Sequence, residues 1–289
     1  MPAAADITRV GVVGCGLMGS GIAEVSARAG LDVVVLESDE RTVDAGRDRV
    51  SASLAQAVRR GKLSEDDRAA TFDRIRFTWE PEALADRQLV VEAVPEIETL
   101  KLDTFRMIDK VVTAPDAVLA SNTSSIPIMK LAMATERPEQ VIGIHFFNPV
   151  PVLPLVELVP SLLTSPTVVE DAAAFASHQL GKHEIRSQDR AGFVVNALLI
   201  PYLLSAIRML ESGFATAEHI DEGMVQGCAH PMGPLALTDL IGLDTVMAVA
   251  ESMYEEFKEP LYAPPPMLSR MVDAGLLGRK SGRGFHQYA

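Results

Sequence analysis

The sequence has few cysteines and no long apolar run. Cys15 and Cys228 are the two cysteines in 289 residues, too few for a disulfide framework and typical of a protein from a reducing compartment. The most apolar stretch, 193–210, is interrupted by Asn196 and Pro201, whereas a bilayer span needs about 20 mostly apolar residues. We therefore interpret this stretch as a buried helix and expect a cytoplasmic protein without a membrane segment.

Positive charge is also scarce. Lys and Arg number 26 and Asp and Glu number 39, which gives a formal net charge of −13. This balance argues against nucleic acid as a partner, because a phosphate backbone requires a basic surface. Residues 1–10 hold no signal-peptide or transit-peptide pattern, so we expect no leader. With 48% hydrophobic and 22% charged residues, the composition excludes disordered and collagen-like classes and indicates a globular core.

Apolar runs alternate with helical patterns over roughly the first 185 residues. We expect strands at 10–13, 32–36, 89–94, 117–121 and 141–147, and charged helices at 44–61 and 64–72. Such alternation predicts an α/β fold with a parallel, doubly wound sheet.

The pattern changes after Asp189 to long apolar helical stretches. These lie at 193–211, 216–228 and 242–258, and no strand pattern accompanies them. We therefore predict two domains, a Rossmann-type NAD-binding domain over 1–188 and an all-helical C-terminal domain over 189–289.

A glycine loop follows the first expected strand and opens the first expected helix. Gly14 allows a tight turn, Gly16 lets the backbone approach a pyrophosphate, and Gly19 lets helix and strand pack closely. Leu17 and Met18 complete the loop, where free N–H groups and the helix dipole favour an anion. The arrangement predicts a dinucleotide site, and the alternative is a tight turn that binds no ligand.

Glu37 ends the second expected strand. At this position a carboxylate accepts hydrogen bonds from the adenine ribose, and its charge repels a 2′-phosphate. Glu37 therefore favours NAD over NADP, although Arg41 close by keeps NADP open. The alternative is that Glu37 binds no ligand and is simply a solvated residue at the end of a strand.

Two apolar strand patterns each contain a residue that is costly to bury alone. His145 ends one of them and Glu157 lies within the next, and each needs a partner in an apolar environment. The two would satisfy each other and form a general base, or they would form a buried pair that only holds a loop. Ser124 lacks a nucleophile elbow, and no metal-binding motif is present.

Several segments resemble one known family, the short-chain L-3-hydroxyacyl-CoA dehydrogenases, and within it the bacterial, particularly actinobacterial, 3-hydroxybutyryl-CoA dehydrogenases. The segments are VGVVGCGLMGSGIA, LVVEAVPE, ASNTSSIPI, IGIHFFNPVPVLPLVELV, DRAGFVVNALLIPYL, HPMGPLALTDLIGLDT and GRKSGRGF. They run from residue 10 to residue 285, and SNTSS together with HFFNPxP is specific to this family.

The resemblance implies an NAD-dependent enzyme of fatty acid metabolism that transfers a hydride reversibly at C3 of a 3-hydroxyacyl-CoA. It implies that His145 is the catalytic base, that Glu157 orients it, and that Ser124 and Asn196 hold the substrate's 3-oxygen and thioester. It also implies a single-function chain and a homodimer formed through the helical domain.

The resemblance assigns further binding residues. Asn148, Glu96 and Lys101 match cofactor positions, the last two near the nicotinamide ribose. For coenzyme A the matching residues are Ser53, Arg60 and Lys62. The chemistry of the segment supports this assignment independently, because an acidic protein needs a local cationic site for a phosphate-bearing ligand, although a solvated helix end would also carry cations.

Two residues depart from the family pattern. Glu37 stands where an Asp is usual, and Ala197 follows Asn196 where many members have Arg. Two other functions stay open, a dehydrogenase of a free 3-hydroxy acid and a non-enzymatic NAD-binding protein such as a lens crystallin. The acyl chain length and the physiological direction also stay open.

Overall fold

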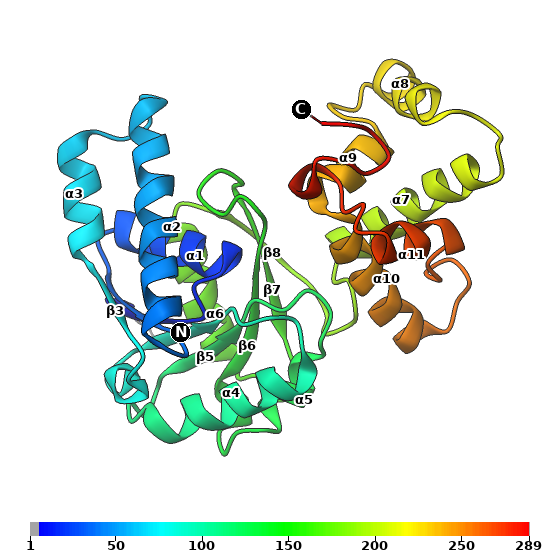
Figure 1. Ribbon diagram of the computed structural model, residues 1–289. Coiled ribbons are helices and arrows are strands. Elements are labelled where there is room, and N and C mark those ends of the chain that lie inside the picture. Colours follow the sequence, from blue (N-terminus) through cyan, green and yellow to red (C-terminus); the bar gives the residue numbers. More distant parts are fainter. Residues whose placement is uncertain (1–5, 289) are drawn as a thin grey trace. The chain divides into compact units, whose positions relative to one another are not determined.

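The computed structural model describes residues 6–288, and the chain divides into two compact units, Met1–Asp189 and Arg190–Ala289 (Figure 1). The expectation that the chain has no leader concerns residues 1–10, and residues 1–5 of these lie outside the described residues. Over residues 6–288, no helix is both long enough and apolar enough to cross a membrane.

The first unit is built on one eight-stranded sheet, with the strand order β3-β2-β1-β4-β5-β6-β7-β8. Its strands are β1 (Arg9–Val13), β2 (Asp32–Leu36), β3 (Ile75–Thr78), β4 (Leu89–Glu92), β5 (Val118–Ser121), β6 (Val141–Phe146), β7 (Leu155–Pro160) and β8 (His183–Arg186). The predicted Rossmann-type sheet is thereby confirmed, and the β1–α1–β2 unit holds the glycine loop.

One pairing corrects the prediction of a parallel sheet. β6 and β7 run antiparallel, while the other neighbouring strands of this sheet are parallel. The physical reason is the loop 147–154 between them, which is shorter than the connection of about a dozen residues that a parallel crossover requires.

Helices cover both faces of the sheet, as a doubly wound fold requires. They are α1 (Leu17–Arg28), α2 (Glu40–Arg59), α3 (Glu65–Asp73), α4 (Glu98–Val111), α5 (Ile128–Ala132) and α6 (Pro166–Ala174). In Figure 1, α1, α2, α3 and α6 lie on one side of the sheet and α4 and α5 on the other. The expected helices at 44–61 and 64–72 correspond to α2 and α3.

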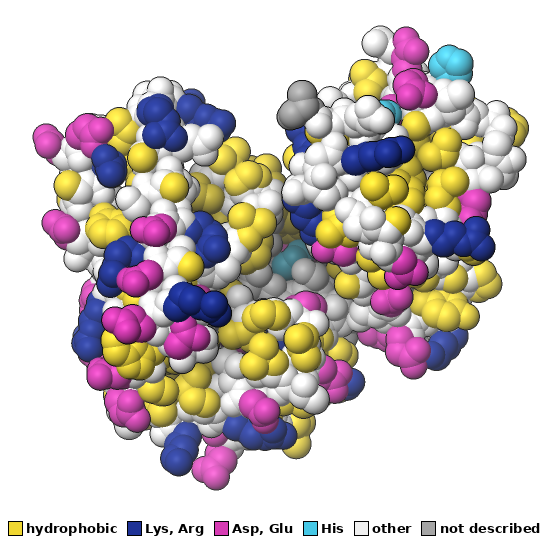
Figure 2. Space-filling model, viewed as in Figure 1, with side chains coloured by type: hydrophobic (Ala, Val, Ile, Leu, Met, Phe, Trp, Pro, Cys, Tyr) yellow, Lys and Arg dark blue, Asp and Glu magenta, His cyan; other side chains and the backbone are white. Residues whose placement is uncertain are grey.

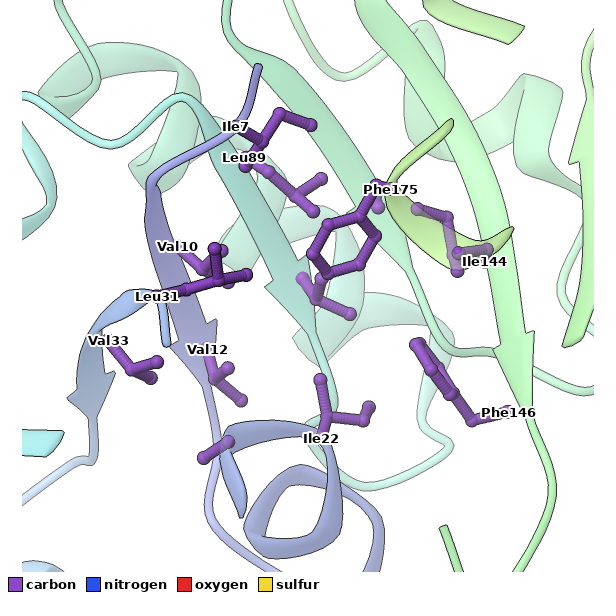
Figure 3. Close-up of a cluster of buried hydrophobic side chains, with 14 of the residues drawn as sticks. Ile7, Val10, Val12, Ile22, Leu31, Val33, Leu89, Ile144, Phe146 and Phe175 are labelled. Carbon is purple, nitrogen blue, oxygen red and sulfur yellow. The ribbon is translucent and has the colours of Figure 1, made fainter. Parts of the chain in front are cut away.

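The core of the first unit lies between the sheet and α1. Figure 3 shows Val12 of β1, Ile144 and Phe146 of β6, Ile22 of α1 and Phe175 converging there. Each of these side chains is at most 1% exposed, and burying such a side chain stabilises the fold by roughly 1.5–3 kcal/mol. This packing fixes the carboxyl ends of β1 and β6, where the glycine loop and His145 lie.

The second unit is helical, as predicted. Its helices are α7 (Val195–Glu211), α8 (Ala217–Cys228), α9 (Pro234–Ile241), α10 (Leu243–Phe257) and α11 (Pro266–Asp273). Leu204 of α7, Leu235 of α9 and Val246 of α10 are fully buried in its core. The C-terminal segment is held by Asp239, whose carboxylate accepts hydrogen bonds from the Phe285 backbone N–H and the Tyr288 hydroxyl.

Candidate active site

The glycine loop has the backbone that its sequence predicts. Gly14 has a φ of +88°, and a Cβ there would lie 2.9 Å from the carbonyl oxygen of Ala93 on the adjacent strand segment. A Cβ at Gly19 would lie 1.8 Å from the carbonyl oxygen of Gly14, a contact that no side chain allows. Glycine at these two positions therefore lets α1 begin immediately after β1.

The start of α1 suits a negatively charged ligand. Gly16 caps this helix without a side-chain hydrogen bond, and its first turn contains no acidic residue. A Cβ at Gly16 would meet no atom within 4 Å, so the backbone here faces open space. The loop lines a groove of about 830 Å³, within the size range of small-molecule sites, and a dinucleotide pyrophosphate fits these N–H groups.

Glu37 borders the same groove. Its carboxylate accepts a hydrogen bond from the Cys15 backbone N–H, so the side chain is held against the glycine loop. Arg49 of α2 also lines the groove and donates a hydrogen bond to the Cys15 carbonyl oxygen at 2.5 Å. The cation that borders this groove is therefore Arg49, whereas Arg41 is not part of the lining.

His145 and Glu157 form a buried pair at the end of β6. The imidazole Nδ1 lies 2.7 Å from Glu157 Oε2, and the side chains are 6% and 0% exposed. Ser124 Oγ lies 3.3 Å from the other imidazole nitrogen, Nε2. A carboxylate on Nδ1 selects the tautomer in which Nε2 carries the lone pair, so Nε2 is the nitrogen equipped to accept a proton.

The loop that carries Ser124 is held by Glu96. The Glu96 carboxylate accepts hydrogen bonds from the backbone N–H groups of Ser124 and Ser125, at 3.0 and 3.2 Å, and from the Thr123 hydroxyl. Burial alone would raise the pKa of Glu96, but the Lys101 charge and the hydrogen bonds from Thr123 and Ser124 together lower it. Glu96 is thus an ionised anchor for the SNTSS segment.

Lys101 lies beneath this anchor and is 1% exposed. Its ammonium group is 2.6 Å from Glu92 Oε1 and 3.2 Å from Glu96 Oε2. Glu92 is fully buried at the end of β4 and also accepts a hydrogen bond from the Ser121 hydroxyl at 2.6 Å. Three charged side chains, Glu92, Lys101 and Glu96, therefore connect the end of β4 with the loop beside His145, and the Ser121 hydroxyl ties them to β5.

Two further predicted site residues, Asn148 and Asn196, lie in different units of the chain. Asn148 is exposed on the loop after β6, and Lys182 holds that loop by donating to the Val150 carbonyl oxygen at 2.8 Å. Asn196 lies near the start of α7 in the second unit.

The three residues predicted to contact coenzyme A lie at the end of α2. Ser53 is half-buried and its hydroxyl helps to lower the pKa of Glu24 of α1. Arg60 and Lys62 are exposed in the turn between α2 and α3. Figure 2 shows Lys and Arg side chains gathered at this turn, at the top of the α2–α3 hairpin. The turn thus presents cations on an otherwise acidic chain.

Three residues of the site were not predicted from the sequence. Glu92 carried a usable signal, because an acid inside the apolar run LVVEAV needs a partner as Glu157 does. Trp79, the single tryptophan of the chain, lines the glycine-loop groove. Arg49 gave no signal, since one more cation on a charged helix has no distinguishing pattern. Over residues 6–288, no group of three or more His, Cys, Asp or Glu side chains could hold a metal ion.

Fold and site together define a class of protein. The sheet is doubly wound, the glycine loop leaves the N-terminus of α1 without a side-chain cap, an acid follows β2, and a buried His–Glu pair lies at the end of β6. This is the architecture of a Rossmann-type dehydrogenase.

Comparison with known proteins gives the family. The family model described as "3-hydroxyacyl-CoA dehydrogenase, NAD binding domain" matches residues 9–190, and "3-hydroxyacyl-CoA dehydrogenase, C-terminal domain" matches residues 192–288. The chain belongs to the 3-hydroxyacyl-CoA dehydrogenase family, an NAD-binding family of oxidoreductases. The resemblance drawn from SNTSS and HFFNPxP is thereby confirmed.

Similar proteins match almost the whole chain. A 3-hydroxybutyryl-CoA dehydrogenase of Mycobacterium tuberculosis H37Rv is 60% identical over 282 residues, which are 98% of this chain and 99% of the relative. The crystal structure of FadB2 from M. tuberculosis has a TM-score of 0.98 and covers 99% of this chain and 100% of its own. The crystal structure of an (S)-3-hydroxybutyryl-CoA dehydrogenase from Ralstonia eutropha is 45% identical in sequence and has a TM-score of 0.91. The match covers 98% of this chain and 100% of the R. eutropha chain.

Proposed function

We propose that the protein is a 3-hydroxybutyryl-CoA dehydrogenase. It interconverts an (S)-3-hydroxyacyl-CoA such as 3-hydroxybutyryl-CoA and the 3-ketone, here acetoacetyl-CoA, with NAD(H) as the redox partner. The observation that carries this proposal is the buried His145–Glu157 pair, with Ser124 on the imidazole Nε2. The names of the M. tuberculosis and R. eutropha relatives support the choice of substrate.

His145 is the general base of the proposed reaction. When bound, the nicotinamide supplies the hydride acceptor. His145 Nε2 takes the proton of the substrate's 3-hydroxyl as C3 is oxidised, and Glu157 stabilises the imidazolium that results. In the reverse direction the same imidazolium returns the proton to the ketone oxygen. Because oxidation releases a proton, rising pH favours the ketone.

Ser124 and Asn196 are the proposed ligands of the substrate's 3-oxygen and thioester. Ser124 is supported by its position 3.3 Å from His145 Nε2, which places a hydroxyl beside the proton-accepting atom. For Asn196 the support is its match to the family motif, and Asn196→Ala should lower turnover of acetoacetyl-CoA without lowering the melting temperature. A loss of folding would make its role structural.

The cofactor site comprises the glycine loop, Glu37, Glu96, Lys101 and Asn148. We propose that Glu37 selects NAD, because its carboxylate is held beside Cys15 at the groove and would repel a 2′-phosphate. Glu96 lies in the loop after β4 and Lys101 in the first turn of α4, where the nicotinamide ribose is expected, and the buried Lys101 acts through Glu96.

The coenzyme A portion of the substrate is assigned to Ser53, Arg60 and Lys62. The exposed cations of the α2–α3 turn suit its phosphates. Replacing Arg60 and Lys62 together by Gln should raise the KM for acetoacetyl-CoA by roughly tenfold, on the order of 1.4 kcal/mol, and leave the KM for NADH unchanged. An unchanged KM for acetoacetyl-CoA would remove this segment from the substrate site.

We also propose separate roles for the two domains, and we propose that the protein is a homodimer. Residues 1–188 bind NAD, and residues 189–289 contribute Asn196 and the dimer contact. In the second unit, the apolar side chains of Leu198 and Phe214 are 75% and 79% exposed, and contact with a second copy of the chain would bury them. Sedimentation velocity at micromolar concentration should give a dimer, and a monomer alone would refute it. The two free cysteines favour a reducing, cytoplasmic location.

The test is an assay at 340 nm with acetoacetyl-CoA, run in parallel with NADH and NADPH. Rapid oxidation of NADH, at least tenfold faster than that of NADPH, supports both the reaction and the role of Glu37. Activity with NADPH alone would preserve the chemistry and refute the cofactor preference. Acetoacetate is the matched control substrate, and activity on it without activity on the thioester would replace the proposal with a free-acid dehydrogenase.

A further inference from the structure

Trp79 leaves the sheet immediately beside Glu37. It follows β3, whose last residue, Thr78, is paired in register with Leu36 of β2. The Glu37 backbone N–H donates to the Thr78 carbonyl oxygen at 2.9 Å, and the Glu80 N–H donates to Thr78 Oγ1 at 3.1 Å. The backbone on both sides of Trp79 is therefore fixed relative to the acid that is proposed to bind the adenine ribose.

The Trp79 side chain is half exposed, at 50%, although it is the largest apolar side chain type. Tryptophan is on average highly buried in folded proteins. Within residues 6–288, its indole makes no ring contact with another aromatic side chain or cation that the structure defines. The exposed part instead lines the glycine-loop groove. An apolar surface held open in a ligand groove calls for a flat apolar ligand group.

The groove beyond Glu37 has apolar walls from two segments. Trp79 and Pro81 line it from the segment that follows β3, and Leu100 and Met107 line it from α4. The short helix η1 (Pro81–Leu84) packs against α4, which brings these two segments together. The groove therefore runs from the anion site at α1, past a carboxylate, into an apolar slot.

This order matches the adenosine half of the cofactor, and the inference rests on the proposed NAD site. The pyrophosphate suits α1, the ribose suits Glu37, and the group attached to that ribose is a planar aromatic base. We propose that Trp79 is the adenine-binding residue of this protein, with its indole stacked on or flanking the base. Aromatic side chains that stack on a base contribute about 1–3 kcal/mol each, so Trp79 should govern cofactor affinity and not the chemical step.

The test uses the emission of Trp79, the one tryptophan in the chain. AMP and ADP-ribose should quench or shift this emission at saturation, and nicotinamide mononucleotide should not. Calorimetry gives affinities that do not depend on the indole: Trp79→Ala should weaken ADP-ribose and NADH binding by about five- to a hundredfold, and Trp79→Phe should restore most of the loss. At saturating NADH, kcat of Trp79→Ala should stay within about twofold of the native value.

Two further results separate the possible failures. Leu162→Ala is the matched control, because Leu162 is 93% exposed on the loop after β7 and should leave binding and emission unchanged. Equal ADP-ribose affinity in Trp79→Ala and the native protein would overturn the adenine role while leaving the proposed function intact. A native protein that binds neither NADH nor ADP-ribose in the calorimeter would instead overturn the NAD site itself.

Discussion

His145 and Glu157 lie directly opposite each other on the antiparallel strands β6 and β7, with imidazole Nδ1 2.7 Å from Glu157 Oε2. Cross-strand pairs at one register position have side chains on the same face of the sheet. The base and its orienting acid are therefore positioned by backbone hydrogen bonds of the sheet. Only Ser124, the third member, depends on a loop, and that loop is anchored by Glu96.

Replacing His145 tests the proposed base. His145→Gln should lower kcat for acetoacetyl-CoA reduction by roughly 10²–10⁴-fold, the usual contribution of a positioned acid–base group. NADH affinity should stay within twofold, because the glycine loop and Glu37 are untouched. Steady-state kinetics and calorimetry on the same preparation give both values. A variant that retains more than a tenth of the native kcat would remove His145 from this role.

The buried charges below the SNTSS loop should be strongly coupled. Lys101→Met leaves Glu92 buried without its counter-ion, and we expect a loss of about 3–5 kcal/mol in the free energy of unfolding. The double variant Glu92→Gln/Lys101→Met should recover much of that loss, since Glu92 then carries no charge, while Glu96 is 35% exposed and keeps its hydrogen bonds from the SNTSS loop. Urea denaturation of the native, single and double variants measures the coupling.

An exposed ion pair serves as the control for this cycle. Lys130 and Glu98 lie 2.8 Å apart with side chains 54% and 45% exposed. Lys130→Met should cost less than about 1 kcal/mol, because solvent screens exposed pairs. Equal losses for Lys101→Met and Lys130→Met would show that burial of the Glu92–Lys101 pair has no energetic consequence.

Thiol reactivity should distinguish the two cysteines. Burial above all raises the pKa of Cys15 to about 12, with the Glu37 charge adding to this rise and Arg49 opposing it. Because the thiolate is the reactive form, Cys15 should resist a disulfide reagent at pH 8 while the exposed Cys228 reacts. One thiol per native chain and two in urea are expected, and Cys228→Ser should remove the fast thiol. Two equally fast thiols in the native protein would contradict this.

The parts of the molecule that were predictable from the sequence have local signatures. The glycine loop, β1, β2 and three helices of the second unit, α7, α8 and α10, follow from short motifs and apolar periodicity, whereas α9 and α11 were not predicted. His145 and Glu157 were recognisable because each is polar within an apolar run. Their contact required only that the two strands be neighbours.

The unpredicted parts depend on distant segments or lie at the sheet edges. β3 and β8 are the two edge strands, four residues each, with exposed or half-buried positions and no continuous apolar run. The sequence does not indicate that Lys101 is buried. Its partner Glu92 lies in β4, and the two side chains meet only because α4 packs against β4. Trp79 could not be placed because its significance arises from β3 pairing with β2.

Glu24 should reduce stability at neutral pH. Its side chain on α1 is 1% exposed, and Oε2 has no hydrogen-bond partner. Burial raises the pKa of Glu24 above its ordinary value, and the hydrogen bond from Ser53 and the Arg28 charge only partly oppose this rise. Because folding raises the pKa of Glu24, the folded protein is favoured at pH values below the ordinary pKa of a glutamate. This contribution to stability is lost as the pH rises through the raised pKa and the buried carboxyl ionises.

Glu24→Gln removes this charge while keeping the shape of the side chain. The variant should gain free energy of unfolding at pH 8, because burying a neutral amide costs less than burying a charged carboxylate. The gain should shrink towards zero near pH 4, where the native carboxyl is protonated. Urea denaturation at both pH values measures it, with Glu222→Gln on the exposed face of α8 as the matched control. A Glu24→Gln protein less stable than the native one at pH 8 would show that the charged carboxylate is stabilised by its surroundings.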